Sequence, residues 1–334
     1  MDDPLLVPTP EGLYCPAGGF HVDPARPVAR AVVTHGHADH CRPGSGALLA
    51  TPQTQAIAAA RFGAGAFGAT QALGYGVPLR LGEVTLRLVP AGHVLGAAQV
   101  VIERGGARAV VSGDYKRRAD PTAAPFEPVP CDLFVTEATF GLPVFRHPPA
   151  ADEVAKLLRS LARFPERCHA VGVYALGKAQ RLMAELRAAG YDGRIFLHGA
   201  LVKLVRVYEA LGVRLGPWEE AAGADRAALR GAVVLAPPSA LADRWARRLP
   251  DPVIAAASGW MRIRQRARQK GVELPMVISD HADWDELCAT IDETGAGAVW
   301  VTHGAEEALC WRCAGRGVDA RPLRLAGLGE DDAG

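Results

Sequence analysis

Four metal-ligating side chains fall within one short segment that directly follows an apolar run. The segment His35–His40 reads HGHADH and comes after the run AVV, which predicts a strand followed by a ligand-rich loop. In an extended chain, residues two apart share a face, so His35 and His37 can bind the same ion. The turn after them directs Asp39 and His40 elsewhere, which indicates a second ion.

Further residues of the same chemical kind stand at the ends of other apolar runs. The strand ends of one sheet lie along a shared edge, so we expect these side chains to converge although they are far apart in the sequence. They are His93, Asp114, Glu137, His281 and His303.

The donor set indicates which ions such a site would take. Imidazole nitrogens with a few carboxylates suit zinc best, and manganese or iron also fits an N/O site. Asp114, a single carboxylate among histidines, could bridge two ions about 3.5–4 Å apart, as in hydrolases with two metal ions. We therefore expect two divalent ions, Zn²⁺ first and Mn²⁺ as the alternative.

The composition excludes several other classes of protein. The chain has 334 residues, 49% hydrophobic and 22% charged, which is ordinary globular composition and argues against disorder. No apolar run reaches the ~18 residues of a membrane span, and the start MDDPLLVPTPEG lacks the features of a signal peptide. Seven scattered cysteines fit reduced thiols. We expect a cytoplasmic protein that does not bind membranes.

Strand and helix patterns divide the chain into three segments. Residues 21–145 read as short strands with few helices, whereas strands and helices alternate from about residue 148, which predicts a parallel sheet. The helices expected there include 178–188, 201–211, 240–248 and 261–270. An apolar strand followed by a polar loop returns at 276–279 and 298–302. We expect a first domain formed by residues 1–147 and 275–334, interrupted by an inserted domain at 148–274.

These motifs together resemble the metallo-β-lactamase superfamily and, within it, the β-CASP nucleases. The HxHxDH signature corresponds to HGHADH, and the later motifs correspond to AGHVLGAAQ, SGDYK, TEATFG, ISDHADWDEL and VTHGAEE. The resemblance covers nearly the whole chain. It implies an α/β fold, an αββα metallo-β-lactamase sandwich with an inserted βα-repeat, parallel-sheet β-CASP domain.

The resemblance also implies a role for each motif residue. One ion would be bound by His35, His37 and His93, and the other by Asp39, His40 and His303, with Asp114 between them. An early aspartate in FHVDP, Asp23, would orient the site. His281 would protonate the leaving oxygen, and Glu137 would hold its imidazole; with Asp23 and Asp39 these two complete the expected catalytic set.

The resemblance suggests substrates and partners as well. The chain is most similar to a bacterial branch of DNA exonucleases associated with ligases, which implies 5′ to 3′ digestion of single-stranded or end-bearing DNA during repair, alongside an ATP-dependent DNA ligase and a helicase. A histidine at the position of His303 is more typical of RNA-processing members, so RNA stays open as a substrate. A small-molecule metallo-hydrolase of the same fold and a catalytically silent nucleic-acid-binding module also stay open.

Contacts to nucleic acid would come from local basic groups, because the net charge is only +1. Three residues at four-residue spacing, Arg262, Arg266 and Lys270, would share one helix face that meets phosphates. Lys178 and Ser258 lie between predicted strands and helices, where backbone N–H groups can also bind phosphate. The pair Cys310 and Cys313 predicts buried thiols on a helix.

Overall fold

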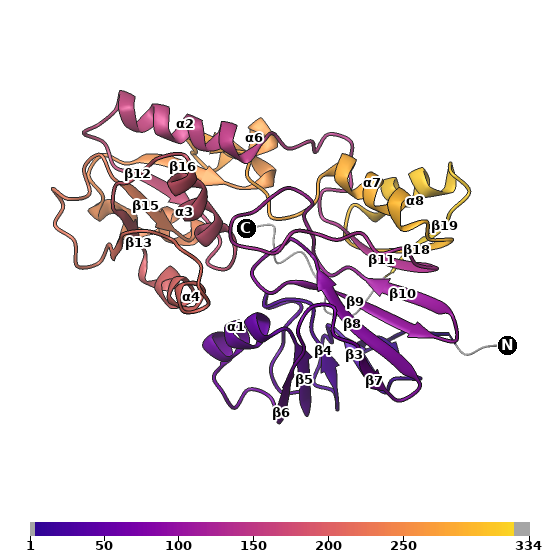
Figure 1. Ribbon diagram of the computed structural model, residues 1–334. Helices are drawn as coiled ribbons and strands as arrows, with labels where there is room; N and C mark the ends of the chain where they lie inside the picture. Colours follow the sequence, from indigo (N-terminus) through magenta and orange to yellow (C-terminus); the bar gives the residue numbers. More distant parts are fainter. Residues whose placement is uncertain (1–3, 324–334) are drawn as a thin grey trace. The chain divides into compact units, whose positions relative to one another are not determined.

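The computed structural model describes residues 4–323 and divides the chain into two compact units (Figure 1). Unit 1 comprises residues 1–145 and 281–334, and unit 2 comprises residues 146–280. The α/β class predicted from the sequence is confirmed, because both units combine sheets with helices. The change from unit 2 back to unit 1 lies after Asp280, later than the expected 274, because strand β17 pairs with β16 of unit 2.

Unit 1 contains two sheets. The first has the order β1-β2-β3-β4-β5-β6. Its strands are β1 Val7–Thr9, β2 Gly12–Cys15, β3 Phe20–Val22, β4 Ala31–Val32, β5 Ala47–Ala50 and β6 Ala69–Ala72. The second has the order β19-β18-β11-β10-β9-β8-β7. Its strands are β7 Leu79–Leu81, β8 Val84–Pro90, β9 Ala98–Arg104, β10 Ala107–Val111, β11 Leu133–Ala138, β18 Ala298–Gly304 and β19 Asp319–Pro322.

Alternating side chains pack the two sheets against each other and against helices. On β9, Val100 and Ile102 join an apolar cluster with residues of the first sheet such as Leu13, whereas Val101 joins a cluster on the other face. That other face is covered by α7 Trp284–Thr294 and α8 Glu306–Ala314, and the outer face of the first sheet packs on α1 Pro52–Phe62 (Figure 1). The period of two along each strand thus produces four layers.

Helix ends in unit 1 follow local capping rules. The Thr51 side chain accepts a hydrogen bond from the Thr54 N–H at the start of α1. At the start of α7, Asp283 and Glu286 form a reciprocal capping box. Such caps satisfy N–H groups that have no partner inside the helix. The second cap matters for the site, because α7 begins three residues after His281.

Unit 2 contains one sheet in which every pairing is parallel, as the strand–helix alternation predicts. Its order is β14-β13-β15-β12-β16-β17. The strands are β12 His169–Gly172, β13 Ile195–Leu197, β14 Trp218–Glu220, β15 Val233–Ala236, β16 Val253–Ala257 and β17 Leu274–Met276, and the longer helices are α2 Ala150–Arg163, α3 Lys178–Ala188 and α4 Gly199–Ala210.

Two helices predicted in unit 2 are broken in the structure. The first splits into α5 Pro238–Ala242 and a 3₁₀ turn at Arg244–Arg248, because Asp243 is extended and its side chain accepts the Arg244 N–H. The second splits into a 3₁₀ turn at Gly259–Arg262 and α6 Arg264–Gln269, because Ile263 is extended with ψ 98°. The prediction of one shared helix face for Arg262, Arg266 and Lys270 is therefore wrong.

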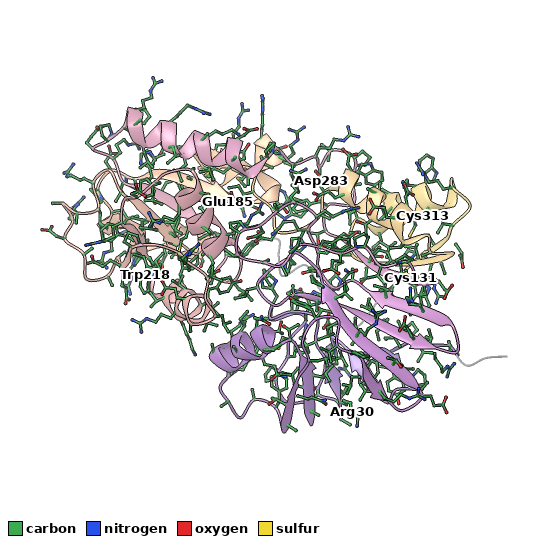
Figure 2. All side chains as sticks on the ribbon, in the orientation of Figure 1. Arg30, Cys131, Glu185, Trp218, Asp283 and Cys313 are labelled. Atoms are coloured by element: carbon green, nitrogen blue, oxygen red, sulfur yellow. The ribbon has the colours of Figure 1, made fainter. Side chains whose placement is uncertain are left out.

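The cysteines agree with the expectation of reduced thiols. All seven are free, and Cys313 on α8 is buried while Cys310 is half-buried. Cys131 and Cys313, labelled in Figure 2, belong to the apolar cluster beneath α7 and α8. Burial raises the pKa of Cys131 to about 12 and that of Cys310 to about 11. Within residues 4–323, no helix is both long and apolar enough to cross a bilayer.

Candidate metal centre

Loops at the ends of strands in unit 1 bring the predicted ligand residues together. The loop after β4 carries the HGHADH segment, the loop after β8 carries His93, and the loop after β10 carries Asp114. Potential ligand atoms within 4.8 Å of one another form three groups, of which the first and the third share Asp114. These are His35, His37, His93 and Asp114; Asp39, His40 and His303; and Asp114, Glu137 and His281.

The first group is a convergence of imidazole nitrogens. The Nδ1 atom of His37 lies 3.0 Å from Nε2 of His35 and 3.0 Å from Nε2 of His93. The Thr34 hydroxyl donates to the Asp23 carboxylate at 2.6 Å and lies 3.1 Å from Nδ1 of His35. It therefore accepts the Nδ1 proton of His35, which leaves the Nε2 lone pair of His35 directed at the cluster.

Asp114 connects the first two groups through its two carboxylate oxygens. Its Oδ2 atom lies 3.3 Å from Nε2 of His35 and 3.6 Å from Nε2 of His93. Its Oδ1 atom lies 3.4 Å from Nε2 of His40. The side chain is 3% exposed. Oδ2 of this buried carboxylate thus faces two histidines of the first group, and Oδ1 faces one histidine of the second.

The second group is oriented by Asp23, which follows the C-terminal end of β3. Asp23 Oδ2 lies 2.7 Å from Nδ1 of His40, and Asp23 Oδ1 accepts the Thr34 N–H at 2.8 Å. Because the carboxylate accepts a hydrogen bond from the Nδ1–H group, Nε2 of His40 points toward Asp114 and toward Asp39, whose Oδ2 is 3.5 Å away. The His303 ring stacks on His40 with centroids 4.9 Å apart.

A bulge between β11 and β18 directs His303 to this group. Glu137 pairs with Thr302 and Ala138 with Gly304, so His303 is the extra residue of the bulge. Its φ is +56°, and a Cβ on Gly304 would lie 2.2 Å from the Ala138 carbonyl oxygen, so only glycine fits there. Asp23, with φ +44°, is also in the left-handed region. Backbone strain in unit 1 is therefore concentrated at site residues.

Burial and neighbouring charges lower the pKa values of three site residues, His93, His303 and Asp114. Burial, with the charge of His35, holds the pKa of His93 well below its usual range. Burial, with the charge of His40, lowers the pKa of His303 to about 4. For Asp114, His40 and His35 outweigh burial and hold the pKa well below its usual value. Neutral imidazoles and an ionised carboxylate are the forms that bind metal ions.

His40 behaves differently. Burial opposes its charge, but the carboxylates of Asp114, Asp39 and Asp23 outweigh burial and raise its pKa well above the usual value. Three negative groups around one imidazole leave an excess of negative charge on this side of the site. A cation at this position would be favoured by the same carboxylates.

The residues present fit divalent metal ions. The Nε2 atom of His303 is buried and has no hydrogen-bond partner among residues 4–323, and Nε2 of His40 faces only the carboxylates of Asp114 and Asp39. A buried polar atom without a partner costs about 1–3 kcal/mol unless a ligand satisfies it. Imidazole nitrogens with carboxylate oxygens are the donors that zinc and manganese accept. Bound divalent ions would satisfy these donors.

The third group contains an imidazole held by a carboxylate. Glu137 Oε2 lies 2.9 Å from Nδ1 of His281, and Glu137 Oε1 accepts the Tyr115 N–H at 2.7 Å. Thr139 Oγ1 also lies 3.3 Å from Nδ1 of His281. Glu137 is 1% exposed. With Nδ1 bonded to the carboxylate, the Nε2 atom of His281 is the one that can exchange a proton with another group.

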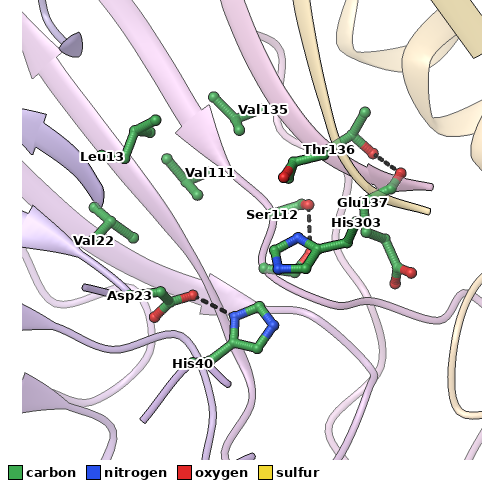
Figure 3. A pocket seen from close by; sticks show the side chains of 12 residues that line it. Leu13, Val22, Asp23, His40, Val111, Ser112, Val135, Thr136, Glu137 and His303 are labelled. Carbon is green, nitrogen blue, oxygen red and sulfur yellow. Dashed lines mark hydrogen bonds and ion pairs between the residues drawn. The ribbon is translucent and has the colours of Figure 1, made fainter. Parts of the chain in front are cut away.

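The site lies directly on the core between the two sheets. Figure 3 shows Asp23, His40 and His303 on one side of a small cavity of about 30 Å³. The opposite wall is apolar and consists of core residues, namely Leu13, Val22, Val111 and Val135. Such a wall lowers the local dielectric constant and strengthens electrostatic interactions at the site.

Two supporting residues were not identified from the sequence. Thr34 connects Asp23 to His35, as described above. Lys116 is 1% exposed and donates from Nζ to the His93 carbonyl oxygen at 3.1 Å and to Asp120 at 2.6 Å. The position of Lys116 two residues after Asp114 in SGDYK was the available signal. Lysines in loops are normally exposed, so the sequence offered no reason to expect Lys116 to be buried beside the site.

The residues expected to contact nucleic acid all belong to unit 2. Lys178 is 4% exposed and pairs with Asp280 at 3.1 Å. Ser258 caps the N–H of Trp260 at 3.3 Å. Arg266 lies over the Trp260 ring, 4.1 Å from its centroid. Arg262 and Lys270 are exposed.

Comparisons with known proteins give one long match and several short ones. No family model matches the chain. The chain is 30% identical over 333 residues to a protein of Opitutus terrae called "Probable DNA ligase", which covers 95% of this chain and 31% of that protein. The chain thus spans about a third of the length of that relative.

The short matches are to proteins named for RNA processing. Endoribonuclease ysh1 of Aspergillus fumigatus is 38% identical over 99 residues, 28% of this chain and 11% of that protein. The cleavage and polyadenylation specificity factor subunit 3 of Dictyostelium discoideum is 37% identical over 98 residues, 28% of this chain and 12% of that protein.

A solved structure shares the fold. A protein of unknown function from Enterococcus faecalis V583 superposes with a TM-score of 0.60 at 13% identity, covering 90% of this chain and 80% of that one. At this identity the likeness concerns the fold alone. The site geometry and the sequence relatives therefore carry the functional argument.

Proposed function

We propose that this chain is a metal-dependent nuclease of the β-CASP group, in which unit 1 is the metallo-β-lactamase domain and unit 2 the inserted β-CASP domain. The observation that carries the proposal is the pair of Asp114 oxygens: Oδ2 faces His35 and His93, and Oδ1 faces His40, all within 3.3–3.6 Å. The similarity to endoribonucleases supports phosphodiester hydrolysis as the reaction. The four-layer arrangement of unit 1 is consistent with the proposed family.

The metal ligands of the proposed enzyme are divided by Asp114. One ion would be held by His35, His37 and His93, and the other by Asp39, His40 and His303. Two divalent ions, Zn²⁺ or Mn²⁺, would supply Lewis-acid stabilisation of the charge that develops on the phosphoryl oxygens. Asp23 keeps the Nε2 atom of His40 on the ligand side by binding its Nδ1.

Proton transfer to the leaving group falls to His281 in this proposal. Glu137 holds Nδ1 of the ring at 2.9 Å, so Nε2 is left to donate a proton to the leaving 3′-oxygen. Glu137 is itself held by the Tyr115 N–H, which fixes the orientation of the ring.

DNA is the proposed substrate, digested from an end in the 5′ to 3′ direction during repair, with an ATP-dependent DNA ligase and a helicase as partners. The long match to a protein called "Probable DNA ligase" supports this choice, because it covers 95% of the chain. RNA processing is the second candidate, supported by the short matches to endoribonucleases and by the histidine at position 303.

The test is hydrolysis of single-stranded DNA and RNA of identical sequence, each labelled at the 5′ or the 3′ end. We expect DNA to be shortened from its 5′ end and excess EDTA to abolish the reaction. Cleavage of RNA faster than of DNA would favour RNA processing over DNA digestion as the function. Hydrolysis of nitrocefin or a thioester without either nucleic acid would reject the nuclease proposal, as would binding without hydrolysis.

A further inference from the structure

Four buried residues lead from the sheet of unit 2 to His281 without forming regular secondary structure. They follow β17 as residues 277–280, and all four are buried. An irregular buried segment must find partners for its backbone groups outside a helix or a sheet. Here charged side chains from α2 and α3 supply those partners.

The backbone of this segment is held by two buried charges. Glu153 on α2, 2% exposed, accepts the Val277 N–H at 2.9 Å. Arg181 on α3, 3% exposed, donates to the Ser279 carbonyl oxygen at 2.5 Å. Hydrogen bonds to charged groups are among the stronger ones in proteins.

Asp280 ends the segment with two buried ion pairs to α3. Its Oδ2 lies 3.1 Å from Nζ of Lys178, and its Oδ1 lies 3.3 Å from Nη1 of Arg181. The side chains of Asp280 and Lys178 are 6% and 5% exposed. Lys178 and Arg181 are three residues apart and so share one face of α3.

Buried ion pairs such as those of Asp280 add little to the stability of a fold. Removing charges from water costs several kcal/mol per ion, and well-packed apolar residues of similar volume are often equally stable. What buried ion pairs provide is a defined geometry, because each partner has one position that satisfies both charges. The geometry defined here is that of the residue directly before His281.

The residues directly after His281 are anchored too, within unit 1. The Ala282 N–H donates to the Tyr115 carbonyl oxygen at 2.6 Å. Asp283 begins α7 and pairs with Arg118 at 2.5 Å. The backbone of His281 is thus bounded on both sides by residues with fixed partners.

We propose that Asp280, Lys178 and Arg181 form a positioning cluster that holds His281 in place for proton donation. This inference rests on the proposed function, because it gives the cluster a role in the same reaction. It assigns Lys178 to the support of His281 in place of direct phosphate binding. Mispositioning a reacting group by about 1 Å can cost on the order of 10²-fold in rate.

The test compares two substrates with Asp280→Asn, which keeps the shape of the side chain and removes its charge. Single-stranded DNA has a leaving oxygen that needs a proton, whereas bis(p-nitrophenyl) phosphate releases a nitrophenolate that does not. We expect kcat on DNA to fall by about 10–100-fold with KM unchanged. On the nitrophenyl ester, kcat should stay within about 3-fold of the parent. His281→Ala should show the same selectivity with a larger loss.

Glu273→Gln is the matched control, because Glu273 forms an ion pair with Arg167 on the surface of the same unit. Equal losses of Asp280→Asn on both substrates, with reduced metal content or melting temperature, would show a merely structural role and overturn the inference. Unchanged kcat on DNA would also overturn it. A parent that hydrolyses neither substrate with metal present would instead reject the proposed function itself.

If the Asp280→Asn variant does not fold, the Lys178→Met variant can be tested in the same way, because Asp280 still forms its ion pair with Arg181. A selective fall in kcat on DNA that Lys178→Arg restores would support positioning. A rise in KM at unchanged kcat would return Lys178 to phosphate binding and overturn the inference.

Discussion

The two units use their buried charged side chains in different ways. In unit 1, buried histidines and carboxylates converge at strand ends, and the Nε2 nitrogen of His303 has no hydrogen-bond partner within residues 4–323. In unit 2, Glu153, Lys178 and Asp280 are buried too, but each has an opposite charge or a backbone N–H as a partner. Unsatisfied donors indicate a ligand site, whereas satisfied ion pairs indicate support of the chain.

The largest effect is expected from Asp114→Ala in unit 1. Because the two oxygens of Asp114 face histidines of different groups, its removal should lower the occupancy of both ions and bring DNA hydrolysis to background. Metal content per chain, measured by plasma mass spectrometry from a parent with close to two ions, checks this. Glu103→Gln, which removes a carboxylate paired with Arg87 and Arg108, is the control. Retention of both ions would reject the bridging role.

Lys116→Met is expected to weaken the metal site without removing a ligand. Lys116 holds the carbonyl of His93, so its loss should shift that imidazole and reduce metal affinity by about 10–100-fold. Competition with a chelator of known affinity measures this. Lys203→Met, which changes an exposed lysine on α4, should leave affinity unchanged. Equal affinities in the two variants would contradict the supporting role of Lys116.

Substitution of the exposed basic residues Arg262 and Lys270 tests whether this surface of unit 2 binds phosphate. Arg262 and Lys270 lie outside one shared helix, so we expect their contributions to be separate. Replacing each with Gln should flatten the dependence of log K on log salt by about 0.7 on single strands, at constant metal content. Filter binding over a range of salt concentrations measures the slope, with Arg194→Gln as control. Unchanged slopes would show that these residues do not contact the nucleic acid.

The smallest effect concerns an exposed ion pair in unit 1. Hydrogen bonds from Arg312, at 2.8 and 2.5 Å, hold the pKa of Asp292 below its usual value of 3.8. Its carboxylate therefore adds stability above pH 3.8, and this contribution is lost as the pH falls through the lowered pKa. Asp292→Asn should destabilise by less than about 1 kcal/mol at pH 7, because water screens the pair. Urea unfolding should show the difference disappearing in acid.

The sequence predicted well where neighbouring residues decide the structure. The alternation of β8 and the bounds of α3 follow from local patterns, and the parallel sheet of unit 2 follows from the strand–helix rhythm. It failed at 261–270, where Ile263 interrupts an otherwise helical pattern. Helix propensity is a weak prior, and the local backbone of one residue was enough to overrule it.

The sequence by itself determined which residue types stand at the strand ends, because the alternation of apolar and polar residues requires only near neighbours. The tertiary structure decided which oxygen of Asp114 faces which histidines, that a bulge turns His303 toward His40, and that Lys178 binds Asp280. These pairs are between residues far apart in the chain. Their geometry depends on how the sheets and helices pack, and packing is a property of the whole fold that no local pattern records.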